Sequence, residues 1–137
     1  NALSSHVPLG LVRDFVTETH QGQSGWLDLK KSGARLFVDA ARVLALAHGV
    51  AATNTLSRLE QAAPKSGIHP DVLHAILDAF RFIQLLRLRL QQEPNTDKSR
   101  ANLLRVDELN PLERRMLKES LQQARRLQSH LKTRYSL

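Results

Sequence analysis

Charged residues at helical spacing between positions 28 and 48 are the first candidates for chemistry. Lys31, Arg35, Asp39 and Arg42 lie three or four residues apart in an otherwise apolar segment, so a helix there would present them as one stripe. Two interpretations are open. Asp39 can form ion pairs with Arg35 and Arg42, which stabilise little on a surface. Alternatively, Arg42 binds a substrate phosphate and Asp39 orients its guanidinium.

A second candidate is an arginine in an apolar setting further along the chain. At helical spacing, Arg87 falls on the same side as Ile76, Phe80 and Ile83. An unpaired guanidinium in a protein core is strongly destabilising. We therefore expect Arg87 either to meet a buried partner such as Asp39 or to face an open cleft.

Two further cations could border such a cleft. Lys30 can reach an anionic ligand or simply point into water. Arg58 follows the run Thr53-Asn54-Thr55, which caps a helix and becomes functional only if it lines the cleft. The candidate binding residues from the sequence are therefore Lys30, Asp39, Arg42, Arg58 and Arg87.

Motifs for catalysis or metal binding are missing from the sequence. It has no cysteine, no glycine-rich phosphate loop and no nucleophile elbow. No two of its six histidines have the i, i+4 spacing of a helical metal site. We therefore assign no catalytic residue and no metal ligand to this chain.

The periodicity of apolar residues predicts helices over 8–17, 28–48, 54–63, 70–92 and from Asn110 onward. Asp28 and Gly49 suit the two caps of the second helix, and Asn110 with Glu113 forms a capping box. The helix over 70–92 is apolar nearly all round, which predicts a central position. The last helix carries one wide apolar stripe from Leu112 to Leu131. Residues 21–25 and 93–109 are predicted loops, and no strand is predicted.

These elements predict an all-α fold, an antiparallel bundle of four to five helices, three long and two short. The 137 residues are enough for one domain with a real core. No apolar run is long enough to span a membrane, and we expect a cytoplasmic protein. Because the chain begins with Asn1 rather than Met, we interpret it as a C-terminal piece of a longer multidomain protein.

The net charge of +7 is concentrated in the last 27 residues, which hold seven Lys/Arg and two Glu. A basic helix can bind nucleic acid or an acidic partner. Only Tyr135 supplies an aromatic ring nearby, and binding to single strands usually needs more. A solvated helix face is therefore the favoured interpretation, and a nucleic-acid partner is disfavoured.

Seven segments, taken in order, resemble the C-terminal substrate-binding domain of a family of nucleotidyltransferases. The resemblance extends from about residue 8 to residue 131 and rests on the ordered set rather than on any single motif. The segments are Leu27–Lys30, Phe37–Val43, Ala47–Val50, Thr53–Leu59, Asp78–Phe82, Leu86–Arg89 and Glu108–Arg115.

The resemblance implies a helical bundle that packs against a catalytic domain similar to that of PII-protein uridylyltransferase. It also implies upstream CBS or cyclic-nucleotide-binding modules and a role in signal transduction. Enzymes of this superfamily hold Mg²⁺ and a nucleoside triphosphate with two aspartates one residue apart. No Asp-x-Asp pair occurs in this chain, so Mg²⁺ and the nucleotide would belong to the missing catalytic domain.

Two functions follow as hypotheses. In the first, the domain positions a substrate against the catalytic domain through the five candidate residues named above. In the second, it is a regulatory module that docks on the sensor modules or forms a homodimer and binds no small molecule. An exposed apolar patch without a polar cleft would favour the second.

Overall fold

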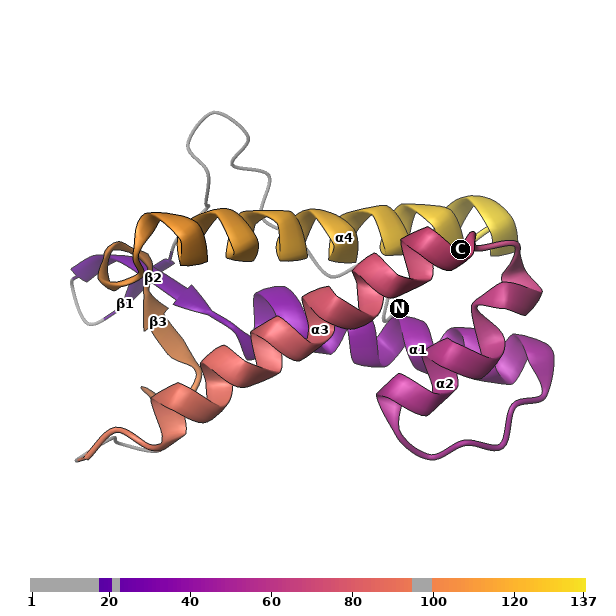
Figure 1. Cartoon of the computed structure of the whole chain (residues 1–137), viewed down its shortest axis with the longest axis horizontal. Coiled ribbons are helices and arrows are strands. Elements are labelled where there is room, and N and C mark those ends of the chain that lie inside the picture. The colour runs from indigo at the N-terminus through magenta and orange to yellow at the C-terminus, as the bar shows by residue number, and fades with distance from the viewer. Residues whose placement is uncertain (1–17, 21–22, 95–99) are drawn as a thin grey trace.

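The chain folds into a helical bundle with a small sheet at one end (Figure 1). The computed structural model describes residues 18–20, 23–94 and 100–137. The helix predicted over 8–17 lies outside these residues. The elements are β1 (Glu18–His20), β2 (Gln23–Asp28), η2 (Lys30–Ala34), α1 (Arg35–His48), α2 (Thr55–Ala62), η3 (Pro64–Ser66), α3 (Pro70–Gln91), β3 (Leu103–Arg105), η5 (Val106–Glu108) and α4 (Pro111–Tyr135).

Four α-helices make up the described part of the fold, and the prediction of an all-α bundle is confirmed. The long helices α3 and α4 pack mainly on each other, and α1 packs mainly on α2. Figure 1 shows α3 crossing beneath α4 in the opposite direction. Helix α1 also contacts α4, and α2 contacts α3. The core is aliphatic, with one aromatic pair, Phe37 and Phe80, whose ring centroids are 5.7 Å apart.

Helix caps follow the predicted chemistry. The Asp28 carboxylate accepts hydrogen bonds from the backbone N–H groups of Lys30 and Lys31, at 3.0 and 2.9 Å. Gly49 ends α1 with φ of 64°, a left-handed conformation that glycine adopts without strain. Asn110 and Glu113 form the predicted capping box of α4.

The sequence predicts one α-helix from residue 28 to residue 48. The structure differs at the beginning of this helix. Residues Lys30–Ala34 form a π-type turn, and α1 proper begins at Arg35. Gly33 in this turn lies against Ile83 of α3: a Cβ there would be 3.1 Å from the Ile83 side chain. The missing Cβ lets this turn pack directly on α3.

The prediction that the chain has no strands is wrong. β1, β2 and β3 form an antiparallel sheet in that order, and Trp26, Leu27 and Asp28 pair with Arg105, Leu104 and Leu103. The predicted loops over 21–25 and 93–109 therefore contain strand residues. β3 has only three residues and pairs with a strand more than 70 residues away, so no local pattern could reveal it.

Two predictions of burial are also corrected. Helix α3 is not central throughout, because Leu85 and Leu88 are half exposed in its C-terminal half. In α4, the predicted apolar stripe is buried from Leu117 to Leu131, but Leu112 and Met116 at its beginning are exposed. Both exposed pairs lie where α3 ends and α4 begins.

Candidate functional site

The charged stripe of α1 lies on the surface. Lys31, Arg35 and Arg42 are exposed and Asp39 is half-buried, because the opposite side of the helix is taken up by core residues. Within the described part of the chain, no ion pair joins Asp39 to Arg35 or Arg42. The stripe therefore presents solvated cations, as does Lys30, which is exposed at the start of η2.

Arg87 has partners that the sequence did not suggest. Its Nε donates to the side-chain oxygen of Asn102 at 2.9 Å, and an Nη group donates to that of Gln84 at 2.7 Å. The backbone carbonyl of Asn102 accepts from the N–H of Leu29 at 2.8 Å. Arg87 thus ties α3 to the segments that flank β3 and α1, and its partners are Asn102 and Gln84 rather than Asp39.

Arg58 also makes a structural contact. Its Nε donates to the backbone carbonyl of Ala52 at 2.8 Å, which closes the loop between α1 and α2. Arg58 lies beyond the C-terminal end of α1, whereas Arg87 and Lys30 lie near its beginning. A helix of 14 residues is about 21 Å long at 1.5 Å per residue. The five residues predicted from the sequence therefore do not converge on one site.

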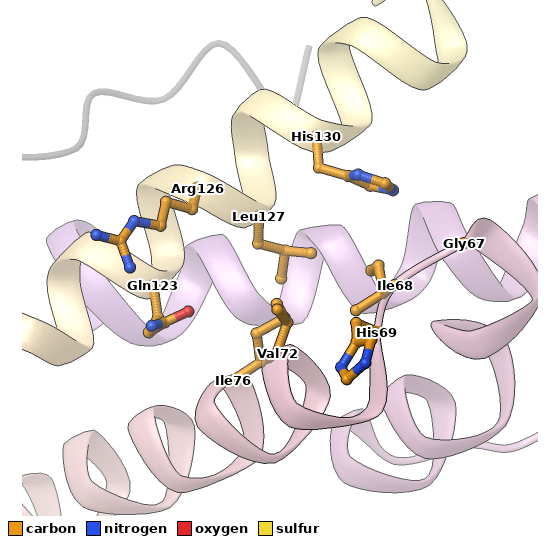
Figure 2. A pocket seen from close by; sticks show the side chains of 9 residues that line it. All are labelled: Gly67, Ile68, His69, Val72, Ile76, Gln123, Arg126, Leu127 and His130. Carbon is orange, nitrogen blue, oxygen red and sulfur yellow. The ribbon is translucent and has the colours of Figure 1, made fainter.

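A pocket of about 270 Å³ lies between the beginning of α3 and the C-terminal half of α4. Figure 2 shows side chains from both helices and from the loop before α3 around it. Its walls are apolar, formed by the buried side chains of Ile68, Ile76 and Leu127 and the half-exposed Val72. Polar groups stand at its edges, and they are His69, Gln123, Arg126 and His130.

Gln123 is the buried polar group of this pocket. The residue as a whole is 8 % exposed, and its Nε2 donates to the Glu119 carboxylate at 3.1 Å. This bond fixes the amide orientation, because only the NH₂ end can donate to a carboxylate. Among the described residues nothing donates to Oε1, and Figure 2 shows this oxygen turned toward the pocket. Among the described residues the buried side-chain atom without a partner is Trp26 Nε1 and not this oxygen, so the Gln123 oxygen is open to solvent. The pocket thus offers an accessible amide in an apolar wall.

A hydrogen-bonded chain of four side chains holds His130 at the pocket edge. Tyr135 donates to Ser66 Oγ at 2.9 Å, and His130 Nε2 lies 3.2 Å from both Oγ and the carbonyl oxygen of Ser66. His48 Nε2 lies 2.7 Å from the Tyr135 hydroxyl. Because that hydroxyl gives its single proton to Ser66, His48 Nε2 must be the donor.

Ser66, the serine among these four hydrogen-bonded side chains, is not a nucleophile. Ser66 is 1 % exposed, so no substrate reaches its hydroxyl, and Tyr135 and His130 already occupy it. The four side chains instead join η3, the end of α1 and the end of α4. They position the His130 ring and the last turns of α4, which form one side of the pocket.

At the other end of the α3–α4 pair, a salt bridge joins the two helices where the pocket separates them at the first end. The Arg89 guanidinium lies 2.5 Å from the Glu113 carboxylate. This hydrogen bond, together with that from the Asn110 backbone, lowers the pKa of the Glu113 carboxyl below its ordinary value. Nearby on α4, a second hollow of about 220 Å³ is lined by Pro111, Arg114, Arg115 and Lys118.

We found neither a metal-binding cluster nor a membrane-spanning helix among residues 18–20, 23–94 and 100–137. These residues contain no group of three or more side chains placed to hold a metal ion. Each helix in the same ranges is too short or too polar to cross a bilayer.

The architecture is thus that of a helical domain with an apolar pocket and no metal cluster among its described residues. The model of one family, described as "Putative nucleotidyltransferase substrate binding domain", matches residues 1–135 of the chain. The chain belongs to this family, and the resemblance inferred from its sequence segments is confirmed. No curated protein and no solved structure matches it.

Sequence reasoning missed the pocket residues for identifiable reasons. Gln123 looks like an ordinary polar residue in a basic amphipathic helix, and His130 has no histidine at metal-site spacing. Ser66 and Tyr135 are 69 residues apart. The only local signal was the break between α2 and α3, where Pro64 and Gly67 turn the chain toward α4.

Proposed function

We propose that this domain holds a substrate of nucleotidyl transfer against a catalytic nucleotidyltransferase domain outside the chain. The observation that carries the proposal is the apolar pocket with the inward-facing Gln123 oxygen, in a member of a substrate-binding family. Small-molecule sites combine apolar walls with a few placed polar groups in this way. Mg²⁺ and the triphosphate would be held by the catalytic domain.

The residues predicted from the sequence have different places in this proposal. Arg42 and Lys30 are exposed cations that could contact an anionic group presented by the catalytic domain, with Asp39 beside them. Arg58 and Arg87 are engaged in hydrogen bonds that hold loops together, so their role would be to support the fold rather than to bind. The setting, a cytoplasmic signalling protein with CBS or cyclic-nucleotide-binding modules, stays a prediction.

The test compares nucleotidyl transfer by a protein that joins this chain to a catalytic domain with transfer by the catalytic domain alone. We expect removal of the helical domain to raise the KM for the acceptor or nucleotide. Val72→Trp, which fills the pocket from a half-exposed position, should do the same. Leu46→Trp is the matched control, because Leu46 is 85 % exposed and lies outside the pocket. Equal kcat/KM with and without the domain would contradict the proposed function.

A second candidate function is the regulatory or dimerisation module. It is favoured by the exposed apolar side chains at the opposite end of the α3–α4 pair, which are Leu85, Leu88, Leu112 and Met116. Such side chains are typical of protein contacts. The test is the mass of the chain in solution as its concentration rises, with Leu85→Ser and Leu112→Ser as variants. A monomer at every concentration excludes the homodimer.

A further inference from the structure

A hollow on the side of α4 gathers three cationic side chains near the beginning of that helix. Its volume is about 220 Å³, and it is lined by Pro111, Arg114, Arg115 and Lys118. Arg114 and Lys118 are half-buried, and Arg115 is exposed. No carboxylate is among the described residues that line it. This basic hollow therefore presents only positive charges to a ligand.

The two carboxylates of α4 do not neutralise these cations. Glu113 pairs with Arg89 on α3, and Glu119 lies 3.6 Å from Arg126, on the side of the helix that faces the pocket. In the part of the chain that the structure describes, neither arginine of the basic hollow forms an ion pair. Their charges remain available to an anion from outside the domain.

The cations of the basic hollow also repel one another. Lys118 follows Arg114 by four residues and Arg115 by three, so it is a neighbour of both on the helix surface. Like charges at these spacings destabilise a helix. An anion bound among the three side chains would replace this repulsion by attraction.

Side chains rather than the end of the helix would hold such an anion. Pro111 has no N–H group, and the N–H of Glu113 already donates to the Asn110 side chain at 2.8 Å. The guanidinium groups of the two arginines can each donate paired hydrogen bonds to phosphate oxygens, and the lysine ammonium adds a third charge.

The size of the basic hollow limits its ligand to a compact group. Pockets for drug-sized molecules span about 300–1,000 Å³, and this hollow is smaller. From its size, its three cations and their lack of carboxylate partners, we infer that the basic hollow binds a diphosphate group, either as free pyrophosphate or as part of a small molecule. This site is separate from the α3–α4 pocket, which lies along the C-terminal half of α4, so the inference goes beyond the proposed function.

The experiment is calorimetric titration of the 137-residue chain with pyrophosphate, ADP, adenosine and a single-stranded oligonucleotide. The buffer holds about 0.15 M salt, to screen distant charges, and no divalent cation. We expect pyrophosphate and ADP to bind and adenosine not to bind. Equal affinities of pyrophosphate and ADP would assign the site to the free anion, and tighter binding of ADP would assign it to the phosphate chain of a larger molecule.

Matched variants separate the basic hollow from the general positive charge of α4. Arg115→Gln and Lys118→Gln should each weaken pyrophosphate binding about tenfold, the value of one hydrogen bond between charged groups. Arg134→Gln and Lys132→Gln remove the same charges about 21 Å or more further along the helix. Because that distance exceeds the Debye length of about 8 Å, these two should leave the affinity nearly unchanged. Arg115 is exposed, so its variant keeps the test independent of folding defects.

Several results would overturn the inference. One is that neither pyrophosphate nor ADP binds. Another is equal weakening by all four variants, or binding of the oligonucleotide alone, because either would indicate a diffuse basic surface. Val72→Trp, which fills the α3–α4 pocket, should leave pyrophosphate binding unchanged, and loss of binding in this variant would place the diphosphate in the pocket instead.

Discussion

The two ends of the α3–α4 pair contrast in what lies between the two helices. At the end near the sheet, Arg89 pairs with Glu113, and Arg87 is bonded to Gln84 and Asn102. At the other end, the pocket keeps open space, and the Gln123 oxygen has no donor among the described residues. The same two helices are thus joined by polar contacts between their side chains at one end and separated by an open pocket at the other.

The largest expected effect compares two isoleucines of α3. Ile83, buried against Gly33, and Ile76, on the pocket wall, are both almost fully inaccessible. Ile83→Ala should destabilise the fold by about 4 kcal/mol, and Ile76→Ala by about 2 kcal/mol, because the space left at Ile76 joins an existing opening. Urea unfolding of both variants measures the difference. Equal losses would mean that the pocket end is packed as tightly as the middle of the helix.

The next effect compares two polar residues, one at each end. Arg87→Met should cost about 1–2 kcal/mol, because it leaves the side-chain oxygens of Gln84 and Asn102 without their donor. Gln123→Leu should change stability by less than about 0.5 kcal/mol, since it removes an unpaired oxygen together with one bond to Glu119. Chemical denaturation of the two variants is the measurement. A large loss in Gln123→Leu would show that this amide serves the fold.

A smaller effect is expected at the tyrosine that supports the pocket edge. Tyr135→Phe removes the hydrogen bonds to Ser66 and from His48 and should cost about 1 kcal/mol. For a domain of this size the melting temperature should fall by about 3–5 °C. Thermal unfolding by circular dichroism checks this. Thr133→Val, at an exposed position two residues earlier, is a control that should leave the melting temperature unchanged.

The smallest effect is a pH dependence at the end joined by the Arg89–Glu113 salt bridge. The pKa of Glu113 is lowered in the folded state, first by the hydrogen bond from Arg89 and then by that from Asn110. Its contribution to stability is therefore present above the ordinary glutamate pKa and is lost as pH falls through the lowered value. Glu113→Gln should be less stable than the unsubstituted chain at pH 7 and equal to it at pH 2. Urea unfolding measures the stability of both proteins at the two pH values. If Glu113→Gln is still less stable at pH 2, the loss comes from the altered helix cap rather than from the charge.

Sequence reasoning went furthest where the determining interactions are local. The caps at Asp28, Gly49 and Asn110 depend on hydrogen bonds or backbone angles within a few residues, and the structure has them. The all-α class followed from apolar periodicity over long segments, for the same reason. The ordered segments from Leu27 to Arg115 also indicated the family, because their order along the chain can be compared without knowing the tertiary structure.

The features that only the tertiary structure decided depend on residues that lie far apart in the chain. The sheet needs β2 and β3, the Arg87 contacts need Asn102, and the His48–Tyr135–Ser66 chain needs three separate elements. Whether a polar residue such as Gln123 is solvated or faces a pocket depends on which helix packs over it. Periodicity reports which side of a helix is apolar, but the side that is left open is set by how the helices cross, and this is why the candidate pocket emerged only from the fold.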